Sequence, residues 1–222
     1  SGSSHTIDDM PHGAYIVDCV RTAGGKKNGA LSKVHPIDLG AHVVNALLDR
    51  NKVDGNLVDD VIFGCVSQIG GQAGNLGRNI VLASKLPEAV PGTVVDRQCG
   101  SSLQAFHFAA QAVMSGTQDI VIAGGVESMS TVPIGSNVAD GAAKQRGMPI
   151  TNSIREKYPE LKGPFFSQFE GAELLAKKCD ITRDDMDKLA LSSHHRAEAA
   201  TKGGYFKNEI VPISVTDKEG KT

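Results

Sequence analysis

Short apolar runs alternate with segments of helical periodicity along residues 14–129. Each apolar run contains β-branched residues and is followed by glycine or polar residues, which is typical of a buried strand. The segments between the runs carry apolar residues three and four positions apart, as amphipathic helices do. We therefore predict strands at residues 15–20, 58–66, 92–96 and 119–123, and helices at residues 35–50, 75–84 and 101–115.

The predicted helix at residues 101–115 carries an apolar stripe that we expect to face the core. The strand that follows, at residues 119–123, is apolar inside, as parallel strands buried on both faces are. Strands that alternate with helices in this way predict an α/β fold, with a parallel or mixed sheet and helices on both faces. The members of the stripe are Leu103, Phe106, Ala110, Val113 and Met114.

The chain changes character after residue 129. Residues 131–169 are rich in Gly, Pro, Ser and Asn and show little periodicity. Helices at residues 170–179 and 182–200 and an extended segment at residues 205–215 are predicted to follow, with Thr182 as a helix N-cap. We predict three parts, which are a tag or disordered lead at residues 1–13, an α/β core at residues 14–129 and an incomplete loop (lid) domain at residues 130–222.

Composition narrows the classes of partner. The 222 residues carry a formal net charge of −2 with dispersed Lys and Arg, which disfavours a nucleic-acid partner. No apolar stretch approaches the roughly 20 residues that span a bilayer, so no membrane is expected. Residues 1–13 lack the features of a signal peptide, and the location expected is cytoplasmic. The four cysteines form no CxxC pair, and three of them, Cys19, Cys65 and Cys179, sit in apolar runs or on an apparent helix face, which favours buried free thiols over disulfides or a zinc site.

Cys99 stands where the predicted strand at residues 92–96 gives way to the predicted helix at residues 101–115. Free N–H groups and the positive dipole end at the start of a helix favour a thiolate over a thiol. The position is also the carboxyl edge of a parallel strand, where ligand sites of α/β sheets lie. On this reasoning Cys99 is either a nucleophile for covalent acyl chemistry or a structural thiol.

Three other features have alternative interpretations. Residues 70–77 follow the spacing GGxxGxxG and not the dinucleotide-binding GxGxxG, so a turn or interface loop is the better interpretation. His107 is interpreted as a core histidine, although a cysteine hydrolase would pair it with Cys99. Gly124 and Gly125 imply close approach by another group, which is either the site around Cys99 or a packed helix.

Several segments form a specific set of motifs: VDCVRTAGGKKNGALS, DDVIFGCVSQIGGQAGNLGRN, VVDRQCGSSLQAFHFAAQAVMSG, IVIAGGVESMS and GGYFKNEIVPISV. The CGSS turn and the AGGVESMS strand end are the most specific pair. Together the segments resemble the N-terminal portion of the thiolases, in particular of the acetyl-CoA acetyltransferase type. The resemblance runs from residue 14 to residue 222 and implies a thiolase-like fold.

The resemblance implies acyl exchange between coenzyme A thioesters, which is thiolysis of a 3-ketoacyl-CoA or condensation of two acetyl-CoA. Cys99 would attack the keto carbon, release acetyl-CoA and carry the acyl group as a thioester until free CoA removes it. The Cys99 N–H is a candidate donor to the oxyanion. The family uses no metal or redox cofactor, and coenzyme A and acetyl-CoA are its substrates. Its members are usually homodimers or tetramers.

The resemblance covers one half of the family's fold. Thiolases carry a second, acid/base cysteine and supporting histidines in a second homologous half, and no Gly-His-Pro or Cys-x-Gly follows Cys99 here. The strand that usually completes the first domain is also missing. We therefore expect an N-terminal fragment, or a split subunit with a C-terminal-half partner chain. The alternative is a catalytically incompetent thiolase-fold assembly or binding module.

Overall fold

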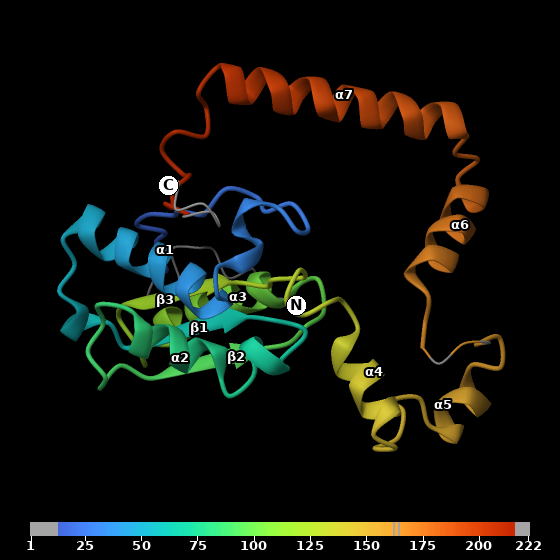
Figure 1. Cartoon of the computed structure of the whole chain (residues 1–222), viewed down its shortest axis with the longest axis horizontal. Helices are drawn as coiled ribbons and strands as arrows, with labels where there is room; N and C mark the ends of the chain where they lie inside the picture. The colour runs from blue at the N-terminus through green and yellow to red at the C-terminus, as the bar shows by residue number, and fades with distance from the viewer. Residues whose placement is uncertain (1–12, 162, 164, 216–222) are drawn as a thin grey trace, which may run out of the picture. The chain divides into compact units, whose positions relative to one another are not determined.

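The computed structural model describes residues 13–161, 163 and 165–215 (Figure 1). The chain divides into two compact units. The first unit comprises Ser1–Asn137 with Glu209–Thr222, and the second is Val138–Asn208. Apart from Gly13, the predicted lead lies outside the described residues.

The first unit is built on a parallel sheet that has three strands in the described residues. The strands are β1 (Asp60–Gly64), β2 (Gly92–Val95) and β3 (Val121–Gly125). Their order, β2-β1-β3, places β1 in the centre, where Ile62 pairs with Thr93 on one side and Ala123 on the other. The predicted α/β fold and three of its four predicted strands are therefore confirmed.

Helices cover both faces of this sheet. Helices α1 (Pro36–Asn51) and α2 (Leu76–Ala83) pack on the face to which Phe63 points, and α3 (Ser101–Met114) packs on the opposite face against Ile62. The cluster on the first face contains eleven buried residues and the cluster under α3 contains three. Since each buried large apolar side chain contributes about 1.5–3 kcal/mol, the α1/α2 face supplies most of the apolar stabilisation.

Side chains at the helix starts explain where α1 and α2 begin. The His35 ring accepts a hydrogen bond from the Ile37 N–H, and Pro36 occupies the first turn, where its missing N–H costs nothing. The Asn75 side chain accepts from the Arg78 N–H at the start of α2. Both observed starts lie within one residue of the predicted ones.

The second unit is helical. Its longest helix starts with a capping box, in which Thr182 and Asp185 each accept a hydrogen bond from the other's backbone N–H. None of the helices in the described chain has the length and apolar character needed to cross a membrane. The helices are α4 (Ser136–Ala143), which begins in the first unit, α5 (Asn152–Lys157), α6 (Gln168–Lys178) and α7 (Arg183–Lys202); the first unit also has the 3-10 helices η2 (Ala30–Lys33), η3 (Gly55–Leu57) and η4 (Gly70–Gln72).

The predicted strand at residues 15–20 is wrong. Tyr15 and Val17 are 87% and 83% exposed, and the described sheet offers this segment no neighbour. A strand needs such a neighbour because its backbone N–H and C=O groups must be paired. A bridge forms only afterwards, between Arg21 and Ile210. The predicted extended segment at residues 205–215 is extended only from that bridge onward, because turns occupy its first residues.

The predicted orientation of the α3 stripe is wrong for Leu103 and Phe106, while Ala110, Val113 and Met114 are half-buried. Leu103 and Phe106 of the apolar stripe are 60% and 40% exposed, whereas Ala105 and Ala109 are buried against the sheet. The sheet beneath the start of α3 carries Gly64, whose missing side chain lets the helix approach closely with its small residues inward. The larger residues then face away from the sheet. Strand β3 is half-buried and not fully buried, because it is an edge strand of the described sheet.

We predict that Gly64→Ala destabilises the first unit. A Cβ at this position would lie 2.3 Å from the Ser102 nitrogen and 2.4 Å from the Ser101 carbonyl carbon, both backbone atoms. Urea denaturation should show a loss of about 1–3 kcal/mol in the free energy of unfolding, the usual cost of overpacking. Gly24→Ala is the control, because no atom lies within 4 Å of its Cβ position. Equal losses in the two variants would contradict the close contact.

Candidate active site

Cys99 lies exposed on the turn between β2 and α3. The turn is held by its own polar groups: the Gln98 N–H donates to Asp96 Oδ1 at 2.8 Å, and the Arg97 N–H donates to Ser101 Oγ at 3.0 Å. Gln98 adopts a left-handed backbone conformation with φ of 48°, which turns the chain sharply before the cysteine. The predicted strand-to-helix position of Cys99 is therefore confirmed.

The start of α3 has no side-chain cap. Gly100 is the N-cap residue and offers no acceptor, and the N–H groups of Ser102 and Leu103 find none among the described residues. Such unpaired N–H groups and the positive helix dipole attract negative charge. The turn of Cys99 therefore lies next to donors suited to a thiolate or an oxyanion, while the specific role of the Cys99 N–H stays a prediction.

Two glycines let α3 rest directly on the sheet. Gly64 of β1 and Gly125 of β3 are register partners, and we call them the glycine pair. A Cβ on Gly125 would lie 2.6 Å from the Ser102 Cβ, so the first turn of α3 occupies the space above both glycines. Gly124 instead faces the Phe63 ring on the other side of the sheet. Of the two interpretations of Gly124 and Gly125, helix packing is the one that the structure supports for Gly125.

The loops that follow β1 and β3 are tied together by two polar side chains that sequence reasoning missed. The Glu127 carboxylate accepts hydrogen bonds from the N–H groups of Ser67 at 2.9 Å and Val66 at 3.5 Å. Gln72, which is fully buried, donates to the Ser67 carbonyl at 2.8 Å and accepts from the Ser128 N–H at 2.6 Å. The glycine-rich stretch at residues 70–77 forms the 3-10 turn η4 and leads into the start of α2, so the predicted turn is confirmed. The one sign in the sequence that could have pointed to the contact is a glutamine among these glycines.

The four cysteines are free thiols, but only Cys65 is buried. Burial raises the pKa of the Cys65 thiol to about 11, and the negative charges of Glu127 and Asp96 act in the same direction. Cys19, Cys99 and Cys179 are exposed, so the predicted burial is right for Cys65 and wrong for Cys19 and Cys179. Exposure rules out a buried structural role for Cys99, and Cys19 and Cys179 share this exposure.

His107 is not placed to serve Cys99. It is exposed on α3, so the interpretation as a core histidine is wrong, and its ring neighbours Phe106 with centroids 6.2 Å apart. Six residues of helix from Ser101 to His107 correspond to a rise of about 9 Å along the axis. No hydrogen bond joins His107 to Cys99 in the described residues, so the structure gives the cysteine-hydrolase alternative no support.

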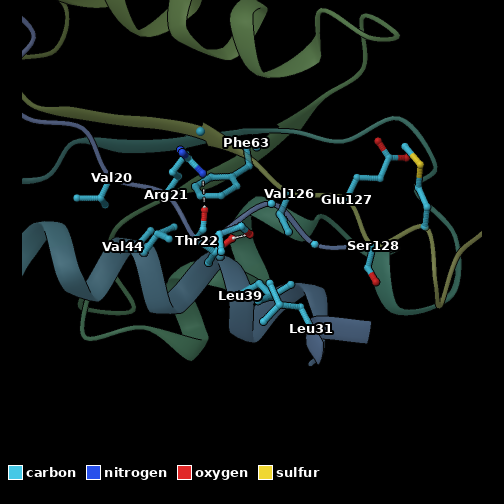
Figure 2. Close-up of a pocket in the computed structure, with 18 of the residues that line it drawn as sticks. Val20, Arg21, Thr22, Leu31, Leu39, Val44, Phe63, Val126, Glu127 and Ser128 are labelled. Carbon is cyan, nitrogen blue, oxygen red and sulfur yellow. Dashed lines mark hydrogen bonds between the residues drawn. The ribbon is translucent and has the colours of Figure 1, made fainter. Parts of the chain in front are cut away.

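A cavity of about 590 Å³ lies along β3 and does not include Cys99. Figure 2 shows apolar side chains of several elements around it, among them Leu39 and Val44 on α1 and Phe63 on β1. Arg21, which lies beside Phe63, and Glu127 also line the cavity. The described residues contain no cluster of three His, Cys, Asp or Glu side chains that could hold a metal ion. The cavity therefore lies beside the sheet, and Cys99 is not among the residues that line it.

The sequence of this chain matches the family described as Thiolase, N-terminal domain, over residues 14–222. The chain belongs to the thiolase family. The predicted resemblance is therefore confirmed, and the turn that carries Cys99 lies within a thiolase N-terminal domain.

Curated thiolases are similar to this chain over nearly all of its length. The steroid 3-ketoacyl-CoA thiolase FadA6 of Mycobacterium tuberculosis (strain ATCC 25618 / H37Rv) is 50% identical over 90% of this chain and 49% of its own length. The beta-ketoadipyl-CoA thiolase of Acinetobacter baylyi is 42% identical over 96% of this chain and 54% of its own length. The 3-ketoacyl-CoA thiolase of Serratia proteamaculans is 40% identical over 92% of this chain and 50% of its own length. The chain thus spans about half the length of these relatives.

We predict that alkylation separates Cys65 from the other thiols. At pH 8 a thiol whose pKa is about 11 is almost entirely protonated, and only the thiolate is nucleophilic. Iodoacetamide should modify Cys19, Cys99 and Cys179 in the folded protein and Cys65 only after unfolding in urea. Peptide mass spectrometry measures the result, and labelling of Cys65 at the rate of an exposed thiol would show that it is not buried in solution.

Proposed function

We propose that this thiolase domain carries the nucleophilic half of an acyl transfer between coenzyme A thioesters, with Cys99 as the residue that becomes acylated. The observation that carries the proposal is an exposed thiol at the uncapped start of α3 in a thiolase N-terminal domain. The relatives named 3-ketoacyl-CoA thiolase support a 3-ketoacyl-CoA as substrate. Coenzyme A and acetyl-CoA are substrates in this proposal and no permanently bound cofactor takes part.

The chemistry divides into two steps. The Cys99 thiolate attacks the 3-keto carbon, and the bond between C2 and C3 then breaks, so that C2 takes the electron pair and a proton and leaves as acetyl-CoA. The thiolate of free CoA next attacks the Cys99 thioester, releases the shortened acyl-CoA and restores the Cys99 thiolate. Backbone N–H groups near the start of α3 stabilise the oxyanions. In the complete protein the proton for C2 comes from an acid/base group outside this domain, and in this chain by itself water supplies it more slowly.

That group belongs, in our proposal, to a second half that covers α3. The outer face of α3 carries Leu103 and Phe106, and its inner face carries the buried Ala105 and Ala109. Large apolar side chains on the outward face of a helix are typical of a surface that another part of a protein covers. The relatives are about twice as long as this chain, which supports such a partner half.

A homodimer or tetramer in a cytoplasmic location completes the proposal. Strand β2 is an edge strand of the described sheet, and such an edge offers backbone groups to a second copy. The free thiols agree with a reducing compartment.

We predict that acetoacetyl-CoA acetylates this chain at Cys99. Intact-mass spectrometry after brief incubation should show one added acetyl group, which Cys99→Ala abolishes because the nucleophile is lost. Cys179→Ala is the matched control, since Cys179 is also an exposed thiol and should leave acetylation unchanged. Acetylation that persists in Cys99→Ala would contradict the assignment, and no adduct on the native chain would favour a binding module without chemistry.

We also predict that Leu103→Asp weakens the association with the second half. The chain would be co-expressed with the part of the Mycobacterium tuberculosis relative that it does not match, and the complex would be purified through one half. A charge at an apolar contact should lower the affinity about tenfold or more, as at other buried interface positions. Leu82→Asp is the control, because Leu82 is 55% exposed on α2. Equal affinities of the two variants would exclude α3 as the contact face.

A further inference from the structure

Gln72 and Glu127 form a reciprocal clamp between the loops that follow β1 and β3. Glu127 reaches from the β3 loop to two N–H groups of the β1 loop, and Gln72 reaches from the β1 loop to Ser128 in the β3 loop. Both groups of the Gln72 amide are used, and the residue is fully buried. Satisfied polar groups in a buried position fix the relative placement of the two loops.

The residue at the centre of the clamp, Ser67, is held by its backbone alone. Its N–H donates to Glu127 and its carbonyl accepts from Gln72, both at hydrogen-bond distance. Its hydroxyl is buried and has no partner among the described residues. The side chain of Ser67 therefore does not contribute to the clamp, and Ser67→Ala leaves the contacts between the loops intact.

We call the paired ends of β1 and β3, on which the first turn of α3 rests, the β1–β3 seam. The clamp lies at this seam. It begins two residues after each member of the glycine pair, Gly64 and Gly125, which receive the first turn of α3. The same β1 loop is bonded to β2, because the Cys65 N–H donates to the Val95 carbonyl at 3.0 Å. Separation of the ends of β1 and β3 would remove the surface under α3 and release the turn that carries Cys99.

We propose that Gln72 and Glu127 are positioning residues for Cys99, which act by holding together the β1–β3 seam beneath the first turn of α3. The role rests on the proposed acyl transfer at Cys99. Neither residue touches the reacting sulfur in the described contacts, so their effect passes through the glycine pair and α3. An acylating thiol requires this placement because a small displacement of a nucleophile lowers the rate of attack strongly.

The test replaces Gln72 by methionine, which keeps the length of the side chain and removes both hydrogen-bonding groups. Amide hydrogen exchange measured by NMR reports how often the turn of Cys99 opens. The two amides to follow are the Ser101 N–H, which donates to the Gln98 carbonyl, and the Gln104 N–H, which donates to the Gly100 carbonyl. We expect both amides to exchange about tenfold faster in Gln72→Met, since buried partners are left unpaired and the local opening becomes easier.

Gln68→Met is the matched control, because Gln68 is an exposed glutamine of the same loop with a hydrogen bond to the Cys65 carbonyl. Ser67→Ala is a second control. Glu127→Gln tests the other half of the clamp if Gln72→Met fails to fold. Exchange of the turn amides at the native rate in a folded clamp variant would overturn the proposal.

Acylation by acetoacetyl-CoA is the second readout and separates the two proposals. A positioning role predicts a lower maximal acylation rate in Gln72→Met, about tenfold below that of the native chain, with the half-saturating concentration unchanged. An unchanged maximal rate in a folded variant would show a structural role only and overturn the positioning role. A native chain that is not acylated contradicts the proposed function, and the exchange rates still decide whether the clamp holds the turn.

Discussion

The contact between the first turn of α3 and the glycine pair, Gly64 and Gly125, determines most of what surrounds it. A Cβ on either glycine would meet α3 at 2.6 Å or less. The helix can therefore descend onto the sheet only where the two strands pair in parallel and in this register. That descent places the preceding turn, with Cys99, at the carboxyl edge of the sheet, where ligand sites of α/β sheets lie.

The same contact decides which face of α3 is exposed. Close approach requires small residues against the sheet, and Ala105 and Ala109 meet this requirement. The larger residues, Leu103 and Phe106, then face away from the described sheet and are exposed. Exposure of neighbouring large apolar side chains to water is unfavourable in free energy. The packing that positions Cys99 therefore also creates an apolar surface of the kind that another part of a protein covers.

Local patterns were sufficient to predict the α/β order, the parallel sheet and the turn of Cys99, because each depends on residues close together in sequence. They failed where the answer depends on a distant segment. The run at residues 15–20 has a strand-like composition but no neighbouring edge in the described chain, and periodicity cannot reveal that. The stripe on α3 showed an apolar face without showing that Gly64 selects the opposite one. Gln72 and Glu127 lie 55 positions apart, and only the fold shows that they share two loops.

Two thiols at neighbouring strand ends differ in exposure. Cys65 follows β1 and is buried with carboxylates nearby, so its pKa is raised to about 11 and it remains a neutral packing residue. Cys99 follows β2 after a left-handed residue, Gln98, which turns the chain outward and leaves the thiol exposed at the uncapped start of α3. The difference arises from backbone path and not from residue type. The exposure of each thiol therefore depends on where the strand ends lie, and hydrogen bonds join the loops after β1 and β3 at this point.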